Sequence, residues 1–156
     1  MHELILLRHA HASNAAPEQA DAERTLSLTG EAEAEAAAAW LRSSGARPQR
    51  VLCSPSARTR QTLERVLARL EYSDTRYEPS IYEATAGDLM GLLDQHKDAG
   101  QVLLVGHNPG IETLVALLAT GQSGEFRGMP PSGIAWLEIA GDIEPGAGSL
   151  KAFWSP

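Results

Sequence analysis

The sequence is poor in features that often define a class of protein. Cys53 is the only cysteine, so a disulfide framework and a zinc site built from cysteines are both excluded. No run of about 18 apolar residues, the length that a membrane-spanning helix requires, is present. The chain reaches the apolar stretch 3–8 without a basic region or a cleavage site, so we expect no signal peptide. A reduced, cytoplasmic setting is the expectation.

Positive charge is also scarce. Lysine and arginine number 13 against 20 aspartate and glutamate residues, and the formal net charge is -7 at pH 7. Nucleic acids and anionic membranes require a basic face, so the balance argues against both partners. Any anion that this protein binds must be held by local positive charge. With 156 residues, 43% of them hydrophobic, the chain has the length of one domain. We expect a single domain over residues 1–156, and a monomer.

Apolar runs alternate with helical patterns along the chain. Continuous apolar runs predict buried strands at 3–8, 50–54 and 101–106. Alanine, leucine and helix-stop signals predict helices at 30–45, 55–70, 87–96 and 108–120. Thr29 is the expected N-cap of the first helix, Gly45 its stop. The last two apolar runs, 133–140 and 150–154, predict a hairpin-like pair. The fold class is therefore α/β: a mainly parallel central sheet flanked by helices on both faces, with an antiparallel C-terminal strand pair.

Each of three predicted strands is followed by residues that can bind an anion or act in catalysis. Arg8 and His9 follow the first strand, Ser54-Pro55 the second, and His107 the third. Because ligands of parallel sheets bind outside the carboxyl ends of the strands, we expect these residues to meet in one crevice.

Two of these strand ends share a construction. Ser54-Pro55 and Asn108-Pro109 each predict an N-cap followed by proline at the first helical position, and such helix starts attract anions. Arg58, one turn into its helix, could clasp a phosphate bidentately. Two histidines and two arginines in one crevice of an acidic protein are suited to a phosphoryl group.

These motifs resemble those of the histidine phosphatase superfamily, which has the phosphoglycerate mutase-like fold. "LLRHA" (6–10) resembles the Arg-His-Gly signature of that family, with Ala10 in place of glycine, and "SPSARTRQT" (54–62) resembles its Ser-Pro-x-x-Arg-x-x-x-Thr block. "LLVGHNPG" (103–110) resembles the block of the second histidine. The short length and "PPSGIAWLEI" (130–139) are most similar to the SixA branch, which are protein phosphohistidine phosphatases.

The resemblance implies a role for each matched residue. His9 would be the nucleophile that becomes phosphorylated, Arg8 and Arg58 would bind the phosphate, and His107 would contact the phosphate and the transition state. The family needs no metal and no other cofactor. Glu83 lies where larger relatives carry an acidic proton donor, although it could equally be a solvated loop residue, since a protonated imidazole can leave without an acid.

Loops supply further candidates for the site. Ser13 and Asn14, in the long loop 10–25, could add hydrogen bonds to the phosphate, and Ser132 could line the pocket. For all three, an ordinary polar loop role is the competing interpretation. The loops 10–25 and 121–132 are expected to set the size of the substrate.

Alternative functions stay open at this point. A metal-dependent hydrolase could use His9 and His11 as a ligand pair, but no Asp or His cluster completes the coordination shell. A non-catalytic phospho-ligand binding module could use the same fold. A third alternative keeps the enzyme and changes the substrate from a phosphohistidine-carrying protein to a small phosphomonoester. The absence of an inserted cap predicts a shallow, open site, which suits phosphohistidine on a folded protein.

Overall fold

A computed structural model describes residues 1–71, 74–124 and 128–156. Residues 125–127 of the predicted loop 121–132 lie outside the described part. The strands are β1 (Glu3–Arg8), β2 (Arg50–Cys53), β3 (Asp74–Tyr77), β4 (Gln101–Gly106), β5 (Ile134–Ile139) and β6 (Gly148–Trp154). The helices are α1 (Leu28–Ser43), α2 (Ala57–Leu67), α3 (Ala86–Asp94) and α4 (Gly110–Thr120), with short 3-10 turns η1 (Asp21–Glu23) and η2 (Pro79–Ile81).

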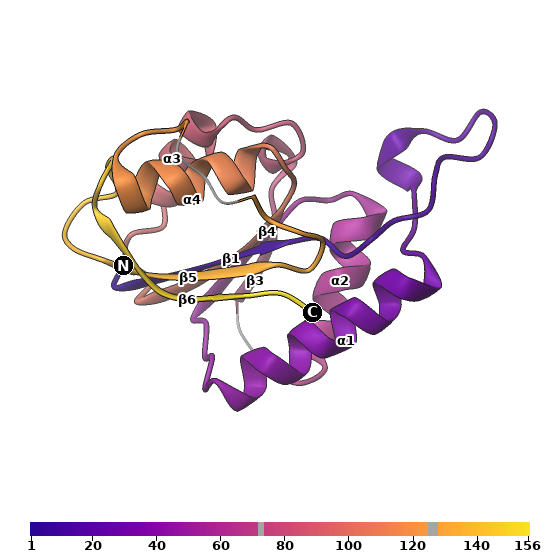
Figure 1. The fold of residues 1–156 in the computed structure, drawn as a ribbon, viewed down its shortest axis with the longest axis horizontal. Coiled ribbons are helices and arrows are strands. Elements are labelled where there is room, and N and C mark those ends of the chain that lie inside the picture. Colours follow the sequence, from indigo (N-terminus) through magenta and orange to yellow (C-terminus); the bar gives the residue numbers. More distant parts are fainter. Residues whose placement is uncertain (72–73, 125–127) are drawn as a thin grey trace.

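All six strands form one sheet in the order β3-β2-β4-β1-β5-β6. β1, β2, β3 and β4 pair in parallel, β5 pairs antiparallel with β1, and β6 pairs antiparallel with β5. Figure 1 shows α3 and α4 over one face of the sheet, with α1 and α2 over the other. The predicted fold class is confirmed, including the antiparallel pair at the C-terminal end.

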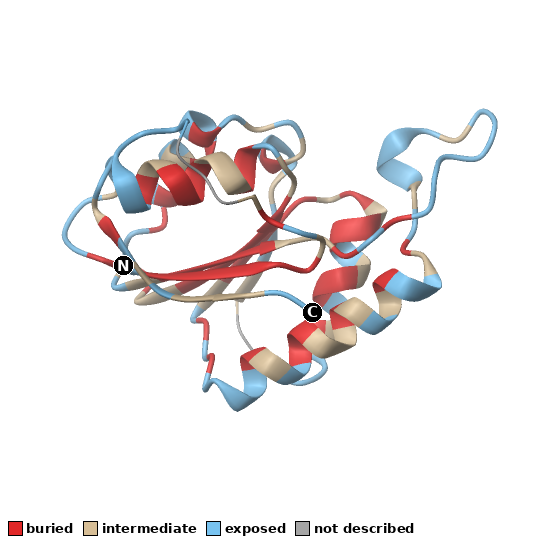
Figure 2. Cartoon of the chain, in the orientation of Figure 1, coloured by how far each residue is buried: buried red, intermediate tan, exposed pale blue. Residues whose placement is uncertain are grey.

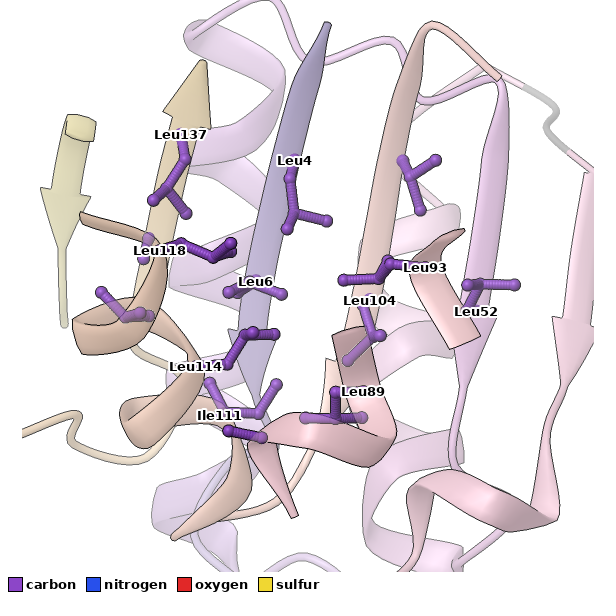
Figure 3. Packing of buried hydrophobic residues seen from close by; sticks show 14 of the residues in the cluster. Leu4, Leu6, Leu52, Leu89, Leu93, Leu104, Ile111, Leu114, Leu118 and Leu137 are labelled. Atoms are coloured by element: carbon purple, nitrogen blue, oxygen red, sulfur yellow. The ribbon is translucent and has the colours of Figure 1, made fainter. Parts of the chain in front are cut away.

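Alternation along β1 divides the core into two layers. Leu4 and Leu6 face α3 and α4, whereas Ile5 and Leu7 face α1 and α2, because successive side chains of a strand point to opposite faces. Figure 3 shows the first layer, in which leucines of the sheet meet Leu89, Leu93, Leu114 and Leu118 of the helices. The central strands β1, β2 and β4 are therefore buried on both faces (Figure 2), which explains their apolar sequence.

The predicted helix caps are wrong by one or two residues. α1 is capped by Ser27, not Thr29, and the Ser27 hydroxyl accepts from the Gly30 amide at 3.0 Å. α2 is capped by Ser56, not Ser54. Ser54 is still extended, because its amide donates to the carbonyl of Val105 in β4.

The N-cap of α4 is Pro109 rather than Asn108. The Asn108 side chain nevertheless accepts from the Glu112 amide at 3.3 Å. Asn108 therefore pairs one of the free backbone amides in the first turn of α4, although it lies one residue before the N-cap. At the far end of α1, Gly45 has φ +78° just beyond the helix, which confirms it as the stop.

The start of α1 is packed tightly against the loop that leaves β1. A Cβ at Gly30 would lie 1.9 Å from the carbonyl oxygen of His11, so only glycine fits there. The amide of His11 also donates to the Glu33 carboxylate of α1 at 2.9 Å. The loop therefore has a fixed beginning, although its middle extends away from the sheet beyond the end of β1 (Figure 1).

Candidate active site

The carboxyl ends of three parallel strands bring the motif residues together, as predicted. Arg8 lies beside Gly106 in the register of β1 and β4, and the His9 amide donates to the Gly106 carbonyl at 3.1 Å. The ring centroids of His9 and His107 are 5.2 Å apart. Residues from separate strands thus converge at one edge of the sheet, as expected for an open parallel sheet.

A cavity of about 300 Å³ opens at this edge. It is lined by Arg8, His9, Asp21, Arg24, Arg58, Tyr82, Glu83, His107 and Asn108. The set contains both predicted histidines, both predicted arginines and Glu83. A pocket lined by three arginines and two imidazoles therefore exists in a chain of net negative charge.

His9 is held in one tautomer by the backbone. Its Nδ1 lies 2.7 Å from the carbonyl oxygen of Ala10. A carbonyl can only accept, so Nδ1 carries the ring proton and Nε2 keeps a free lone pair. Burial, opposed by that hydrogen bond and reinforced by Arg58 and Arg8, lowers the pKa of His9 to about 4. The ring is therefore neutral near pH 7, with its Nε2 unprotonated.

His107 is fixed by Ser54, which lies at the end of the neighbouring strand. The His107 Nε2 and the Ser54 hydroxyl oxygen are 2.8 Å apart. The His107 Nδ1 is buried and has no hydrogen-bond partner among residues 1–71, 74–124 and 128–156. Burial and the nearby His9 and Arg58 lower the pKa of His107 to about 3. The second imidazole is thus also neutral and has one uncommitted nitrogen.

Arg8 and Arg58 use some of their hydrogen-bond donors on protein partners. Arg8 donates from Nη1 to the carbonyl oxygen of Met129 at 2.8 Å, and its buried Nε has no partner in the described part of the chain. Arg58 donates from Nη1 to the backbone oxygen of Asp21 at 2.8 Å and from Nη2 to the Asp21 carboxylate at 2.9 Å. A guanidinium has five N–H donors, so each arginine retains donors for an anion.

Asp21 joins three cavity residues and is absent from the sequence-based candidates. Its carboxylate accepts from the Tyr82 hydroxyl, from Arg24 Nη1 at 2.9 Å and from Arg58 Nη2. These hydrogen bonds hold the pKa of the carboxyl far below its usual range. Asp21, Arg24 and Tyr82 come from an irregular loop and a short turn. The contacts of Asp21 with Arg58 and Tyr82 span 37 and 61 residues along the chain. The only signal for Asp21 and Arg24 was the length of loop 10–25.

Asp21→Asn is expected to weaken the binding of inorganic phosphate. The aspartate accepts hydrogen bonds from both terminal nitrogens of Arg58 and so orients a guanidinium that lines the cavity. Loss of this orienting contact should raise the inhibition constant of phosphate by roughly tenfold. Glu23→Gln, an exposed change in the same turn, is the control and should have no effect. Tighter phosphate binding by Asp21→Asn would mean that the aspartate competes with the ligand for Arg58.

The other residues predicted for the site differ in their position relative to the cavity. Glu83 is exposed at the mouth of the cavity. Ser13 and Asn14 are exposed and do not line it; the Ser13 carbonyl instead accepts from Arg24 Nε at 2.9 Å. Ser132 is fully buried behind the cavity, where its amide donates to the His9 carbonyl at 3.2 Å. The structure therefore brings Glu83 to the pocket, and it does not bring Ser13, Asn14 or Ser132 to its surface.

His11→Ala is expected to leave activity nearly unchanged. The His11 ring is exposed, and its Nδ1 lies 2.7 Å from the Ser27 hydroxyl, outside the cavity lining. Steady-state kinetics should give kcat/KM within roughly threefold of the wild type. A loss comparable to that of a His9 variant would place His11 in the active site.

The low pKa of His9 leads to an expected pH profile. We expect activity to require the neutral ring of His9, and therefore to persist below pH 6.5, the ordinary pKa of histidine, and to fall as the pH drops through about 4. This loss of activity at acid pH should be seen in kcat/KM, which reports the ionisation of the free enzyme and the free substrate. The ionisation of the substrate is therefore measured separately. An acid limb near pH 6.5 would show that His9 is not buried as described.

Neither a membrane-spanning helix nor a cluster of metal ligands is found among residues 1–71, 74–124 and 128–156. No helix in these ranges combines the length and apolar character needed to cross a membrane. No group of three or more histidine, cysteine, aspartate or glutamate side chains in these ranges is arranged to hold a metal ion.

Comparison with known proteins shows the family of this chain. The model of the histidine phosphatase superfamily (branch 1) matches residues 4–99. An uncharacterised protein of Mycobacterium tuberculosis is 34% identical over 158 aligned residues, which cover 94% of this chain and 98% of that protein. An uncharacterised chloroplastic protein of Arabidopsis thaliana is 32% identical over 98% of this chain and 77% of its own length.

Solved structures give the same result. A candidate phosphohistidine phosphatase SixA from Agrobacterium tumefaciens superposes with a TM-score of 0.87 at 33% identity, covering 99% of this chain and 98% of that one. The protein histidine phosphatase SixA complexed with tungstate superposes with a TM-score of 0.84 at 28% identity, covering 99% and 97%. On its sequence, fold and site, this chain belongs to the histidine phosphatase superfamily (branch 1), with a SixA-type structure, and it is a phosphatase.

Proposed function

We propose that this phosphatase removes phosphate from phosphohistidine on a protein, through a phosphohistidine intermediate on His9 and without a metal. The observation that carries the proposal is the hydrogen bond from His9 Nδ1 to the Ala10 carbonyl, which leaves a neutral Nε2 in a cavity lined by three arginines. The similarity to SixA structures supports the choice of substrate.

The reaction consists of two in-line displacements at phosphorus. In the first, the lone pair of His9 Nε2 forms a bond to phosphorus while the bond to the substrate imidazole breaks, and its electron pair stays on the leaving nitrogen, which is protonated. In the second, water attacks the phosphoryl group, its proton passes to solvent, and the bond to His9 breaks to give inorganic phosphate. Arg8, Arg58 and the uncommitted nitrogen of His107 donate to the equatorial oxygens, on which the negative charge is spread.

Glu83 is the proposed proton donor for substrates that need one. Its exposed carboxyl lies at the mouth of the cavity. An alkoxide leaving group requires a proton as the bond breaks, whereas an imidazole can be protonated beforehand. Glu83→Gln should therefore slow the hydrolysis of an alkyl phosphate more than that of phosphohistidine.

The substrate is tested by comparing kcat/KM for a phosphohistidine carrier protein with that for phosphoserine peptide and for a sugar phosphate, each with and without a chelator. The expected result is preference for the phosphohistidine protein and no loss of activity on chelation. Preference for a small ester would favour the phosphomonoesterase alternative. Activity that chelation abolishes and zinc or manganese restores would establish the metal-dependent alternative.

A further inference from the structure

A second hollow, of about 490 Å³, adjoins the catalytic cavity. The two share the residues Tyr82, Glu83, His107 and Asn108. The remaining lining comes from residues 84–86, at the start of α3, and from Pro109, Gly110 and Thr113, at the start of α4. Arg8, His9 and Arg58 do not line it. The hollow therefore adjoins the cavity along these shared residues, and the proposed nucleophile and phosphate arginines are not part of its lining.

The geometry of an in-line displacement indicates what this hollow could bind. The leaving group must lie across the phosphorus from the attacking His9 Nε2, so it leaves the cavity on the side away from that nitrogen. We infer that the hollow binds the leaving-group side of the substrate, namely the histidine-bearing segment of a protein, and that it takes an apolar side chain next to the phosphohistidine. This inference rests on the proposed function.

The charges around the hollow favour a neutral or cationic occupant. No lysine or arginine lines it, and the one charged side chain is that of Glu83. A leaving group with its own phosphate or carboxylate would find no cation there. A histidine ring is neutral or positively charged when it leaves, and its positive form is complementary to Glu83.

The helix starts at the hollow do not compensate for the missing cations. At α3, the amide of Asp88 donates to the Thr85 hydroxyl, and the Asp88 carboxylate accepts from the Thr85 amide in return. At α4, the amides of Ile111 and Glu112 donate to the His107 carbonyl and the Asn108 side chain. Because these first-turn amides are already paired, a second anion would have few donors.

The walls of the hollow are mainly apolar and held together. Ala84, Ala86 and Pro109 contribute no side-chain hydrogen-bonding group. The starts of α3 and α4 are in close contact, since a Cβ at Gly110 would lie 2.5 Å from the Ala84 carbonyl oxygen. The hollow is therefore preformed and suits an aliphatic side chain, as ligand sites lined by apolar residues do.

Thr113→Trp tests this inference, because it fills the hollow from α4 without changing any residue that lines the catalytic cavity. The readout is kcat/KM for the phosphohistidine protein and for phosphoramidate, a small N–P compound with no side chains. We expect a loss of roughly tenfold or more with the protein and little change with phosphoramidate. Ala119→Trp, at an exposed position further along α4, is the matched control and should affect neither substrate.

A second measurement uses wild-type enzyme and two phosphohistidine peptides, with leucine or glutamate flanking the modified residue. The leucine peptide should be preferred by roughly tenfold. Equal losses with both substrates in Thr113→Trp, no loss with either, or preference for the glutamate peptide would overturn the inference. A wild-type enzyme that fails to hydrolyse the phosphohistidine protein and both peptides would overturn the proposed function itself, and the inference with it.

Discussion

His9→Ala is expected to reduce the hydrolysis of phosphohistidine and of phosphate esters by a factor on the order of 10⁴ or more, since the variant lacks the atom that we propose as the site of the covalent intermediate. The reason is structural. The Ala10 carbonyl fixes the proton on Nδ1, and burial keeps Nε2 neutral. The His107 Nε2 is not available in its place, because it is engaged by Ser54.

The measurement is kcat/KM for the variant and for the wild type with the same substrates. His11→Ala is the control, because it removes an imidazole two residues away without entering the cavity. A His9→Ala enzyme that retained most of its activity would place the nucleophile elsewhere.

Arg58→Ala is expected to lower kcat/KM by about 10²–10³, the range found when one donor to a developing negative charge is removed. Arg58 is 7% exposed, lines the cavity and is held by both the backbone and the carboxylate of Asp21. Its planar fork can donate to two phosphoryl oxygens, so Arg58→Lys should restore only part of the loss.

Arg60→Ala is the matched control for Arg58→Ala. Arg60 lies on the same helix, is exposed, and donates from Nε to the Pro55 carbonyl at 3.0 Å. Its guanidinium stacks over the ring of Tyr77, 4.4 Å from the centroid, rather than facing the cavity. Equal effects of the two substitutions would mean that the helix as a whole, and not the Arg58 guanidinium, supports activity.

The sequence predicted the sheet and the centre of the site because both depend on local patterns. The runs 3–8 and 101–106 coincide with β1 and β4, since strands buried on both faces must be apolar throughout. Once those strands were assigned, the rule for parallel sheets was enough to predict that Arg8, His9 and His107 meet.

Other parts of the site could not be predicted, because they depend on contacts between distant residues. Ser54 is a good N-cap residue by type, yet pairing with β4 keeps it extended and turns its hydroxyl to His107. The tautomer of His9 depends on which carbonyl lies beside Nδ1. Asp21 is one acidic residue among several in a polar loop until folding brings Arg58 and Tyr82 to it.

The loop between β1 and α1 shows how such residues are positioned. Gly30 allows the start of α1 to approach the backbone of His11, and Arg24 donates from Nε to the Ser13 carbonyl across the loop. Both ends of the loop are thereby fixed, so η1 can carry Asp21 to Arg58. Ser13, predicted to bind phosphate with its side chain, is instead seen to orient Arg24 through its backbone.

The central claim, a phosphorylated His9, is tested most directly by stopping the reaction of the enzyme with a phosphohistidine substrate and locating the phosphate on the protein. Quenching in base, followed by peptide mass spectrometry and ³¹P NMR, should find phosphate on Nε2 of His9, stable in base and lost in acid. The His9→Ala variant should carry none. Phosphate that is stable in acid, or that is attached to another residue, would contradict the account.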